Sequence, residues 1–149
     1  MDSQFMDLVE IRPFKDTDRN FILNSWLLSC RGSPMFKECP DRIFYPKLTR
    51  IVQHLLDTKQ VAVLCAKSDI DQITAWICFE RIEEPALNTV YFAFTKKPYR
   101  ELGAQTFLFG QLLGDDPVQY AIPTGLGHKV ASALDAIYNP YVLLRLPCN

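Results

Sequence analysis

The sequence lacks an excess of charge of either sign. Its 16 lysines and arginines are balanced by 17 aspartates and glutamates, which gives a formal net charge of -1. Proteins that bind nucleic acid through its phosphates carry a basic surplus or a basic patch. The composition therefore does not indicate a nucleic-acid partner.

Long hydrophobic runs are also missing. No apolar stretch approaches the roughly 20 residues that a helix needs to cross a bilayer. The N-terminal segment "MDSQFMDLVE" has no basic region of the kind that opens a secretory signal. We therefore expect no membrane partner and predict a cytoplasmic location.

The cysteines and histidines show no ligand-like spacing. The five cysteines are an odd number without a CxxC pair, and neither His54 nor His128 has a cysteine or histidine close to it in the sequence. This pattern predicts reduced, structural thiols and no metal site.

What is present is an ordinary globular composition, with 149 residues of which 48% are hydrophobic. That length fits one domain, residues 1–149, with a core of its own. Apolar spacing predicts ten elements, with an irregular connection at 31–45. In chain order they are a strand at 8–13, a helix capped by Asp16 or Thr17, a helix from Pro46, strands at 61–66 and 73–80, a strand from Val90, a helix at 103–113, a strand at 118–122, a helix at 129–138 and a strand at 141–146. The order β-α-α-β-β-β-α-β-α-β indicates an α/β fold of the α+β type, with a mixed sheet covered by helices.

The segment from Val90 to Gln105 is the most informative. An apolar, aromatic strand leads into a polar turn with two lysines, a proline and Arg100, and Gly103 then opens an apolar helix. The first N–H groups of a helix have no internal partner, and the helix dipole there favours negative charge. This strand, turn and helix predict a cradle for a diphosphate.

The run "VYFAFTKKPYRELGAQTFLFGQLL" resembles the acetyl-CoA-binding segment of the GNAT superfamily of N-acetyltransferases, a strand, then Arg/Gln-x-x-Gly-x-Gly/Ala, then a helix. Arg100 and Gly103 match the first two marked positions. Gln105 stands where the pattern has a small residue, which argues against tight CoA binding. GNAT folds have the same order of elements, so the resemblance covers most of the chain and implies a GNAT-like acyl-CoA N-acyltransferase fold.

The resemblance also implies how acetyl-CoA is held. The charge partners of the diphosphate are Lys96, Lys97 and Arg100, and the backbone N–H groups are those of Glu101, Leu102, Gly103, Ala104, Gln105 and Thr106. The pantetheine amides pair with the backbone of Phe92, Ala93 and Phe94, where the fourth strand of the fold splays from the fifth. In a sheet without that splay, these three residues are simply core.

Candidates for proton transfer follow from the same resemblance. Tyr138, expected at the end of the last helix, matches the tyrosine that protonates the leaving thiolate, although a half-buried packing role also fits. Glu80, at the end of the third strand, is the candidate base, with Glu83, Glu84 and His128 as further possibilities or simply solvated groups. Ser25, Trp26 and Arg31 could form an acceptor wall between the first two helices; in the alternative, Trp26 is a core residue and Arg31 interacts with the dipole at the C-terminus of the first helix.

Two functions follow. The first is an acyl-CoA-dependent N-acetyltransferase that transfers an acetyl group from acetyl-CoA to an unknown amine. The second comes from "FILNSWLLSCRGSP" and "VYFAFTKKPYR", which are similar to small GNAT-like proteins of tailed bacteriophages. They imply a non-catalytic virion or assembly protein with phage structural partners, located in the host cytoplasm or the virion. Either protein could form a homo-oligomer, because a short closing strand invites strand sharing.

Overall fold

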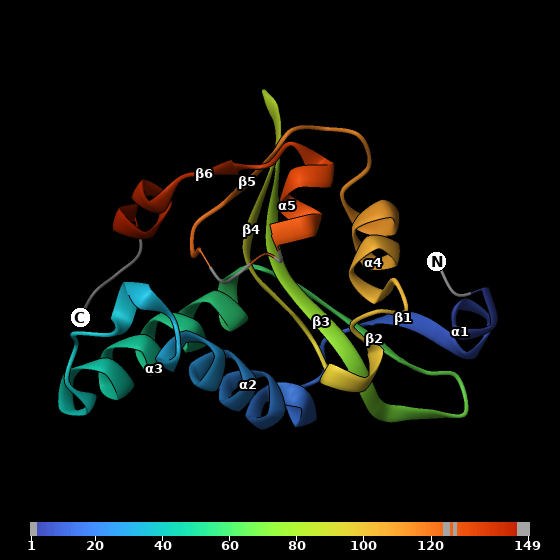
Figure 1. Cartoon of the computed structure of the whole chain (residues 1–149), viewed down its shortest axis with the longest axis horizontal. Coiled ribbons are helices and arrows are strands. Elements are labelled where there is room, and N and C mark those ends of the chain that lie inside the picture. Colours follow the sequence, from blue (N-terminus) through green and yellow to red (C-terminus); the bar gives the residue numbers. More distant parts are fainter. Residues whose placement is uncertain (1–2, 124–125, 127, 146–149) are drawn as a thin grey trace.

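A computed structural model describes residues 3–123, 126 and 128–145 of the chain. Its centre is one six-stranded sheet in which the strands follow their chain order, β1-β2-β3-β4-β5-β6 (Figure 1). Neighbouring strands from β1 to β4 pair antiparallel. The pairs β4–β5 and β5–β6 are parallel. This confirms the predicted mixed sheet. The bounds are Val9–Pro13 for β1, Gln60–Ala66 for β2, Asp69–Glu83 for β3, Ala86–Thr95 for β4, Val118–Tyr120 for β5 and Ile137–Tyr138 for β6.

Helices cover both faces of the sheet (Figure 1). α2 and α3 pack on one face over one core cluster, and α1, α4 and α5 pack on the other face over a second. None of the described helices combines the length and hydrophobicity needed to span a bilayer. The helix bounds are Ser3–Leu8 for α1, Arg19–Arg31 for α2, Asp41–Thr58 for α3, Ala104–Leu112 for α4 and His128–Leu134 for α5. Short helical turns lie at Asp16–Asp18 (η1), Pro34–Phe36 (η2), Lys97–Tyr99 (η3) and Pro140–Arg145 (η4).

Aromatic side chains fill the core between the sheet and α2. Trp26 lies 5.3 Å from Trp76 and 5.3 Å from Phe92, measured between ring centroids. The Trp76 indole N–H donates to the Ser25 hydroxyl at 3.0 Å. Ser25 and Trp26 are therefore core residues, and the alternative of an acceptor wall was wrong for them.

The second long helix begins earlier than expected. α3 starts at Asp41, whereas the sequence placed its start at Pro46. The carbonyl of Pro40 accepts the first hydrogen bonds, and the added turn buries Phe44, over whose ring the Arg31 guanidinium lies at 4.4 Å. Burial of a large aromatic side chain outweighs the one hydrogen bond that a proline near the helix start removes.

The C-terminal elements differ from the prediction. The last helix ends at Leu134, Asp135 takes a left-handed φ of 52°, and Tyr138 lies in strand β6 instead of at a helix end. The segment expected as the closing strand forms the turn η4, and the expected strand end at Leu146 falls outside the described residues. The cause is local: the Asn139 side chain accepts from the backbone of Tyr141 and turns the chain away from the sheet.

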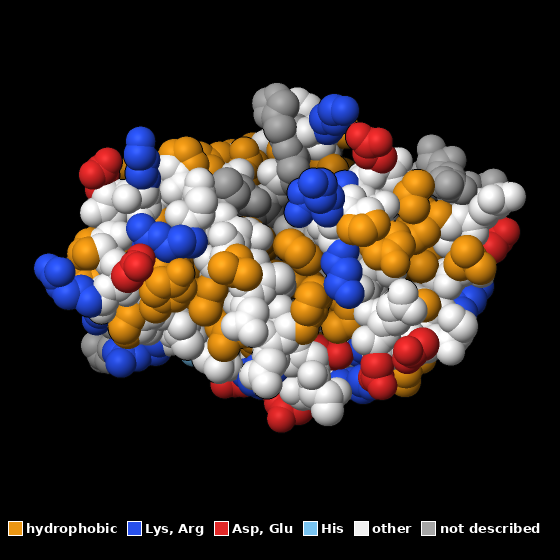
Figure 2. Space-filling view, turned by 60° about the horizontal axis from the view of Figure 1, so that its bottom comes forward, with side chains coloured by type: hydrophobic (Ala, Val, Ile, Leu, Met, Phe, Trp, Pro, Cys, Tyr) orange, Lys and Arg blue, Asp and Glu red, His pale blue; other side chains and the backbone are white. Residues whose placement is uncertain are grey.

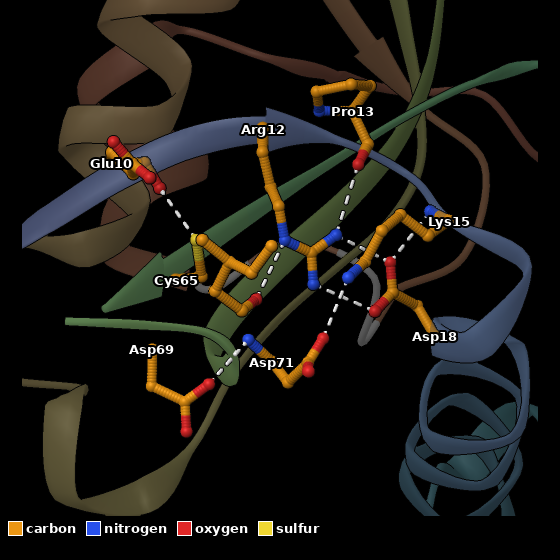
Figure 3. A network of polar contacts seen from close by, with 9 residues as sticks. Glu10, Arg12, Pro13, Lys15, Asp18, Cys65, Asp69 and Asp71 are labelled. Carbon is orange, nitrogen blue, oxygen red and sulfur yellow. Dashed lines mark hydrogen bonds and ion pairs between the residues drawn. The ribbon is translucent and has the colours of Figure 1, made fainter. Parts of the chain in front are cut away.

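A buried ion pair holds the start of α2 against the sheet (Figure 3). Arg12 on β1 forms two hydrogen bonds with the Asp18 carboxylate, at 2.7 and 2.9 Å, and donates a third to the carbonyl of Ile70 at 2.8 Å. Lys15 adds a salt bridge to Asp71 at 2.7 Å. These contacts tie β1, η1 and the β2–β3 hairpin into one unit.

Four of the five cysteines are described, and all four carry free thiols, as predicted. Burial raises the pKa of Cys30 to about 12 and also raises the pKa of Cys65 and of Cys78. Buried, protonated thiols of this kind act as small hydrophobic side chains.

Candidate acyl-CoA site

Strand β4 carries a bulge where the candidate site begins. The β3 neighbours Cys78 and Phe79 pair with Phe92 and Val90, so Tyr91 is an extra residue on β4. Consequently Tyr91 and Phe92 both join the core under α2 and α3, although neighbouring strand residues normally point to opposite faces. A bulge bends the strand that carries it.

Beyond Val90 the strands β4 and β5 separate. β5 pairs only with Asn88, Thr89 and Val90, and the Ala121 N–H makes a last contact with the Val90 carbonyl at 3.4 Å. β4 continues to Thr95, and its strand partner over that stretch is β3. The splay that the resemblance implies is therefore present, and it exposes one backbone edge of β4.

A cavity of about 420 Å³ lies at this opening. Four elements line it, namely the second half of β4, the start of α4, α2 and α5. Its charged lining residues in the described part of the chain are Arg100 and Lys129, both cationic. Figure 2 shows lysine and arginine side chains near the middle of one face of the molecule, next to exposed hydrophobic groups. The cavity therefore favours an anionic ligand.

The start of α4 supplies backbone donors at the cavity. Gly103 precedes the helix with φ of 84°, a left-handed conformation that glycine adopts without strain. Phe107 donates to the Gly103 carbonyl at 2.9 Å. The N–H groups of Ala104, Gln105 and Thr106 come before that bond, and none of them has an acceptor among the described residues.

Thr95 and Arg100 join the end of β4 to this turn. The Arg100 Nε donates to the Thr95 carbonyl at 3.0 Å, which fixes the guanidinium at the cavity and leaves its two terminal nitrogens for a ligand. Thr95 is 5% exposed and lines the same cavity. Its hydroxyl is buried and has no hydrogen-bond partner among the described residues. An unpaired buried hydroxyl costs stability.

The structure brings seven of the eleven predicted ligand residues together at the cavity, namely Phe92, Ala93, Phe94, Arg100, Gly103, Gln105 and Thr106. The other four do not line it. Lys97 and Glu101 are exposed on the turn, Leu102 packs in the core under α4, and Ala104 is buried.

Four lining residues escaped the sequence analysis, namely Ser29, Thr95, Lys129 and Val130. Thr95 directly follows the predicted stretch of β4, and that continuity could have identified it. Ser29 on α2 and the two residues on α5 are distant in sequence, and only the packing of those helices brings them to the cavity.

Glu80 was expected at the end of its strand, but it pairs with Thr89 inside β3, which continues to Glu83. Its carboxylate forms a salt bridge with Lys59 at 2.7 Å and accepts a hydrogen bond from the Tyr91 hydroxyl at 3.3 Å. Glu80 does not line the cavity, but Tyr91 connects it to the bulge, one residue before the lining residue Phe92.

Tyr138, Glu83 and Glu84 do not line the cavity. Tyr138 is 42% exposed and packs against Tyr120, with ring centroids 5.5 Å apart. Glu83 forms a salt bridge with Arg81, and Glu84 is exposed. The side chain of His128 falls outside the described part of the structure.

Comparison with known proteins yields structural matches only, since no family model and no curated protein matches the sequence. A predicted acetyltransferase of Clostridium acetobutylicum, solved with acetyl-CoA, is 17% identical, with a TM-score of 0.54 over 85% of this chain and 88% of that one. A Corynebacterium glutamicum structure described as histone acetyltransferase HPA2 and related acetyltransferase is 14% identical, with a TM-score of 0.56 over 74% and 75% of the two chains. An aminoglycoside antibiotic 6'-N-acetyltransferase of Acinetobacter baumannii is 12% identical, with a TM-score of 0.50 over 95% and 92%. At these identities the likeness concerns the fold alone, and the fold of this chain is that of the GNAT acetyltransferases.

Proposed function

We propose that this protein binds acetyl-CoA in the cavity between β4 and β5 and transfers the acetyl group to an amine. One observation carries the proposal. The strands separate over the N-terminus of α4, and the opening is lined by Thr95, whose buried hydroxyl has no partner among the described residues. A sheet that only needed to be stable would close this gap or pair the hydroxyl.

The donors around the cavity fit the chemical groups of coenzyme A. A diphosphate would lie at the N–H groups that begin α4, with Arg100 and Lys129 as charge partners. The free edge of β4 would pair with the pantetheine amides, as an added strand pairs with a sheet edge. Thr95 lies between these two regions, so its hydroxyl would donate to a phosphate or amide oxygen.

Acetyl-CoA would supply the acetyl group and a thiolate leaving group. Glu80 is the proposed proton acceptor for the attacking ammonium, because it reaches the bulge through the Tyr91 hydroxyl. Tyr138 is the proposed proton donor to the thiolate. In that role it would act from the end of β6, the strand that pairs in parallel with β5. Both roles remain proposals about residues outside the cavity lining.

A charge placed at the start of α4 tests the binding site. We expect Thr106→Glu to stabilise the helix, since a carboxylate favours a helix N-terminus, and at the same time to repel the diphosphate. The matched control is Gln111→Glu, which adds the same charge near the other end of the same helix, away from the cavity.

Isothermal titration with acetyl-CoA measures both variants and the unmodified protein. We expect binding tighter than about 100 µM, roughly -5.5 kcal/mol, for the protein and for Gln111→Glu, and a loss of at least about tenfold for Thr106→Glu. Release of free thiol in the presence of a panel of amines then identifies the acceptor. Equal affinity in both variants would place the ligand elsewhere.

A non-catalytic virion or assembly protein on the same fold is the second candidate. Gln105 lines the cavity where the GNAT pattern has a small residue, and neither Glu80 nor Tyr138 lines it. These observations favour a scaffold that has lost its chemistry, because fold does not fix function. The absence of acetyl-CoA binding, together with recovery of the chain in purified virions at a fixed stoichiometry, would support this candidate.

A further inference from the structure

Lys59 forms a salt bridge with Glu80, the candidate base, and so places an amine of the chain where an acceptor amine would have to lie. Lys59 directly follows α3, and its backbone N–H donates to the Leu55 carbonyl at 2.8 Å, which fixes the residue at the helix end. Its ammonium lies 2.7 Å from the Glu80 carboxylate. The Lys59 side chain is 20% exposed, so it is held in place without being sealed from solvent.

This amine lies next to the bulge that opens the cavity. Its nitrogen is 5.9 Å from the centre of the Tyr91 ring, and the Tyr91 hydroxyl donates to the same carboxylate as Lys59. Tyr91 is the extra residue of the bulge and precedes Phe92, which lines the cavity. Glu80 itself is paired with Thr89, one residue before the point where the strands separate. The pair therefore lies outside the cavity lining, at the level of the sheet where the β4–β5 opening begins.

We propose that Lys59 is a site of self-acetylation. The inference rests on the proposed binding of acetyl-CoA. In the step, the Lys59 ammonium gives a proton to the Glu80 carboxylate, and the neutral amine forms a C–N bond with the thioester carbonyl carbon. The C–S bond breaks, the coenzyme A thiolate takes the second proton from the amine nitrogen and leaves as the thiol, and Glu80 releases the first proton to solvent. An amide on Lys59 and free coenzyme A are the products, and no oxidant or reductant is needed.

Two other nucleophiles, Cys78 and Lys47, are less suited to this step. Cys78 is fully buried in the same region, and burial raises its pKa, so the thiol stays protonated. Lys47 lies on the first half of α3, the helix that ends just before Lys59, and its side chain is exposed. Lys47 therefore serves as an internal control for acetylation that depends on accessibility alone.

Two acetyl donors separate a positioned amine from a merely accessible one. Acetic anhydride reacts with the protein without a binding site, and we expect it to label Lys47 faster than Lys59, because Lys59 is ion-paired and mostly buried. With acetyl-CoA we expect the reverse order, with Lys59 faster by about a hundredfold, the size of a general-base contribution. Peptide mass spectrometry over time reads both rates, and a rate constant independent of protein concentration identifies transfer within one molecule.

Two variants complete the experiment. Lys59→Arg keeps a cation at Glu80 but removes the reactive amine, so the label should disappear from this position. Glu80→Gln removes the proton acceptor and should slow the labelling of Lys59 by acetyl-CoA about a hundredfold, while it speeds labelling by acetic anhydride, because the ion pair is gone.

Calorimetric titration with coenzyme A in parallel separates the two proposals. If coenzyme A binds but acetyl-CoA labels Lys59 no faster than Lys47, self-acetylation is refuted and the binding proposal stands. Labelling that is insensitive to Glu80→Gln would refute it as well. If coenzyme A does not bind, the proposed function fails, and the inference fails with it.

Discussion

The unpaired hydroxyl of Thr95 gives the sharpest test of the candidate site. Replacing Thr95 with valine removes the hydroxyl and keeps the shape and the β-branched stiffness of the side chain. This hydroxyl is buried and has no partner in the part of the chain that the structure describes, and Thr95 is 5% exposed. The substitution should therefore stabilise the protein and weaken its binding of acetyl-CoA. Opposite signs of this kind are characteristic of a ligand-binding group and not of a structural one.

The expected magnitudes follow from the cost of unpaired polar groups. Leaving a hydroxyl buried and unsatisfied costs about 1–3 kcal/mol, so we take about 1 kcal/mol as the gain on its removal. For a chain of this length, that corresponds to a rise in melting temperature of about 2–4 °C. Loss of one hydrogen bond to the ligand, also worth about 1 kcal/mol, should weaken the affinity for acetyl-CoA by roughly fivefold to tenfold.

Thr74 is the matched control. It is 2% exposed on the neighbouring strand β3, and its hydroxyl donates to the Leu64 carbonyl at 3.1 Å. Thr74→Val removes a satisfied hydrogen bond and leaves Thr95 untouched, so it should lower the melting temperature and leave the affinity unchanged. Differential scanning calorimetry and isothermal titration on the two variants measure both quantities.

Two results would refute the reasoning on Thr95. A loss of stability in Thr95→Val as large as that in Thr74→Val would mean that the hydroxyl is bonded within the protein. A gain in stability with unchanged affinity for acetyl-CoA would mean that the hydroxyl points away from the ligand.

Three further predictions concern the buried Arg12–Asp18 ion pair, the glycine before α4 and the cavity residue Gln105. Asp18→Asn should destabilise the protein by about 3–5 kcal/mol in urea unfolding at neutral pH, because it leaves the buried Arg12 guanidinium unpaired. Burial raises the pKa of Asp18, but the hydrogen bonds and charge of Arg12 and Lys15 more than offset this and hold the folded-state pKa below its usual 3.8. The stability gained above that usual value is lost as the pH falls through the folded-state pKa, and a variant without this acid-dependent loss would confirm the assignment. Gly103→Ala should cost about 1 kcal/mol, because φ is 84° there, and thermal unfolding measures the cost. Gln105→Ala restores a small residue at the cavity and should tighten acetyl-CoA binding in calorimetry, whereas unchanged affinity would show that Gln105 does not hinder the ligand.

Local patterns predicted most of the sheet and the long helices. The strands predicted at 61–66 and 73–80 lie within β2 and β3, and the strand predicted from Val90 lies within β4, although β3 and β4 extend beyond the apolar runs. Gly103 followed by an apolar helix predicted the start of α4 within one residue. These features depend on residues close together in the chain, which is why a single sequence contains the information.

The errors have two causes, a distant contact that overrides a local preference and a local turn that interrupts an apolar run. Pro46 signals a helix start, but burial of Phe44 extends α3 back to Asp41. The apolar run that begins at Tyr141 looks like a strand, but Asn139 turns the chain and η4 packs its Val142 against the core under α2 and α3.

The sequence by itself determined the order of elements from β1 to α5, the glycine at the helix start and the cationic Arg100 beside it, because each is a property of a short segment, whereas it missed α1 and β6. Only the tertiary structure decided that β4 bulges at Tyr91, since the bulge appears in the register with β3 and not in either strand alone. The same holds for the unpaired hydroxyl of Thr95 and for the contact of Lys59 with Glu80. Whether a polar atom finds a partner depends on which distant segments surround it, and that is settled only when the chain has packed.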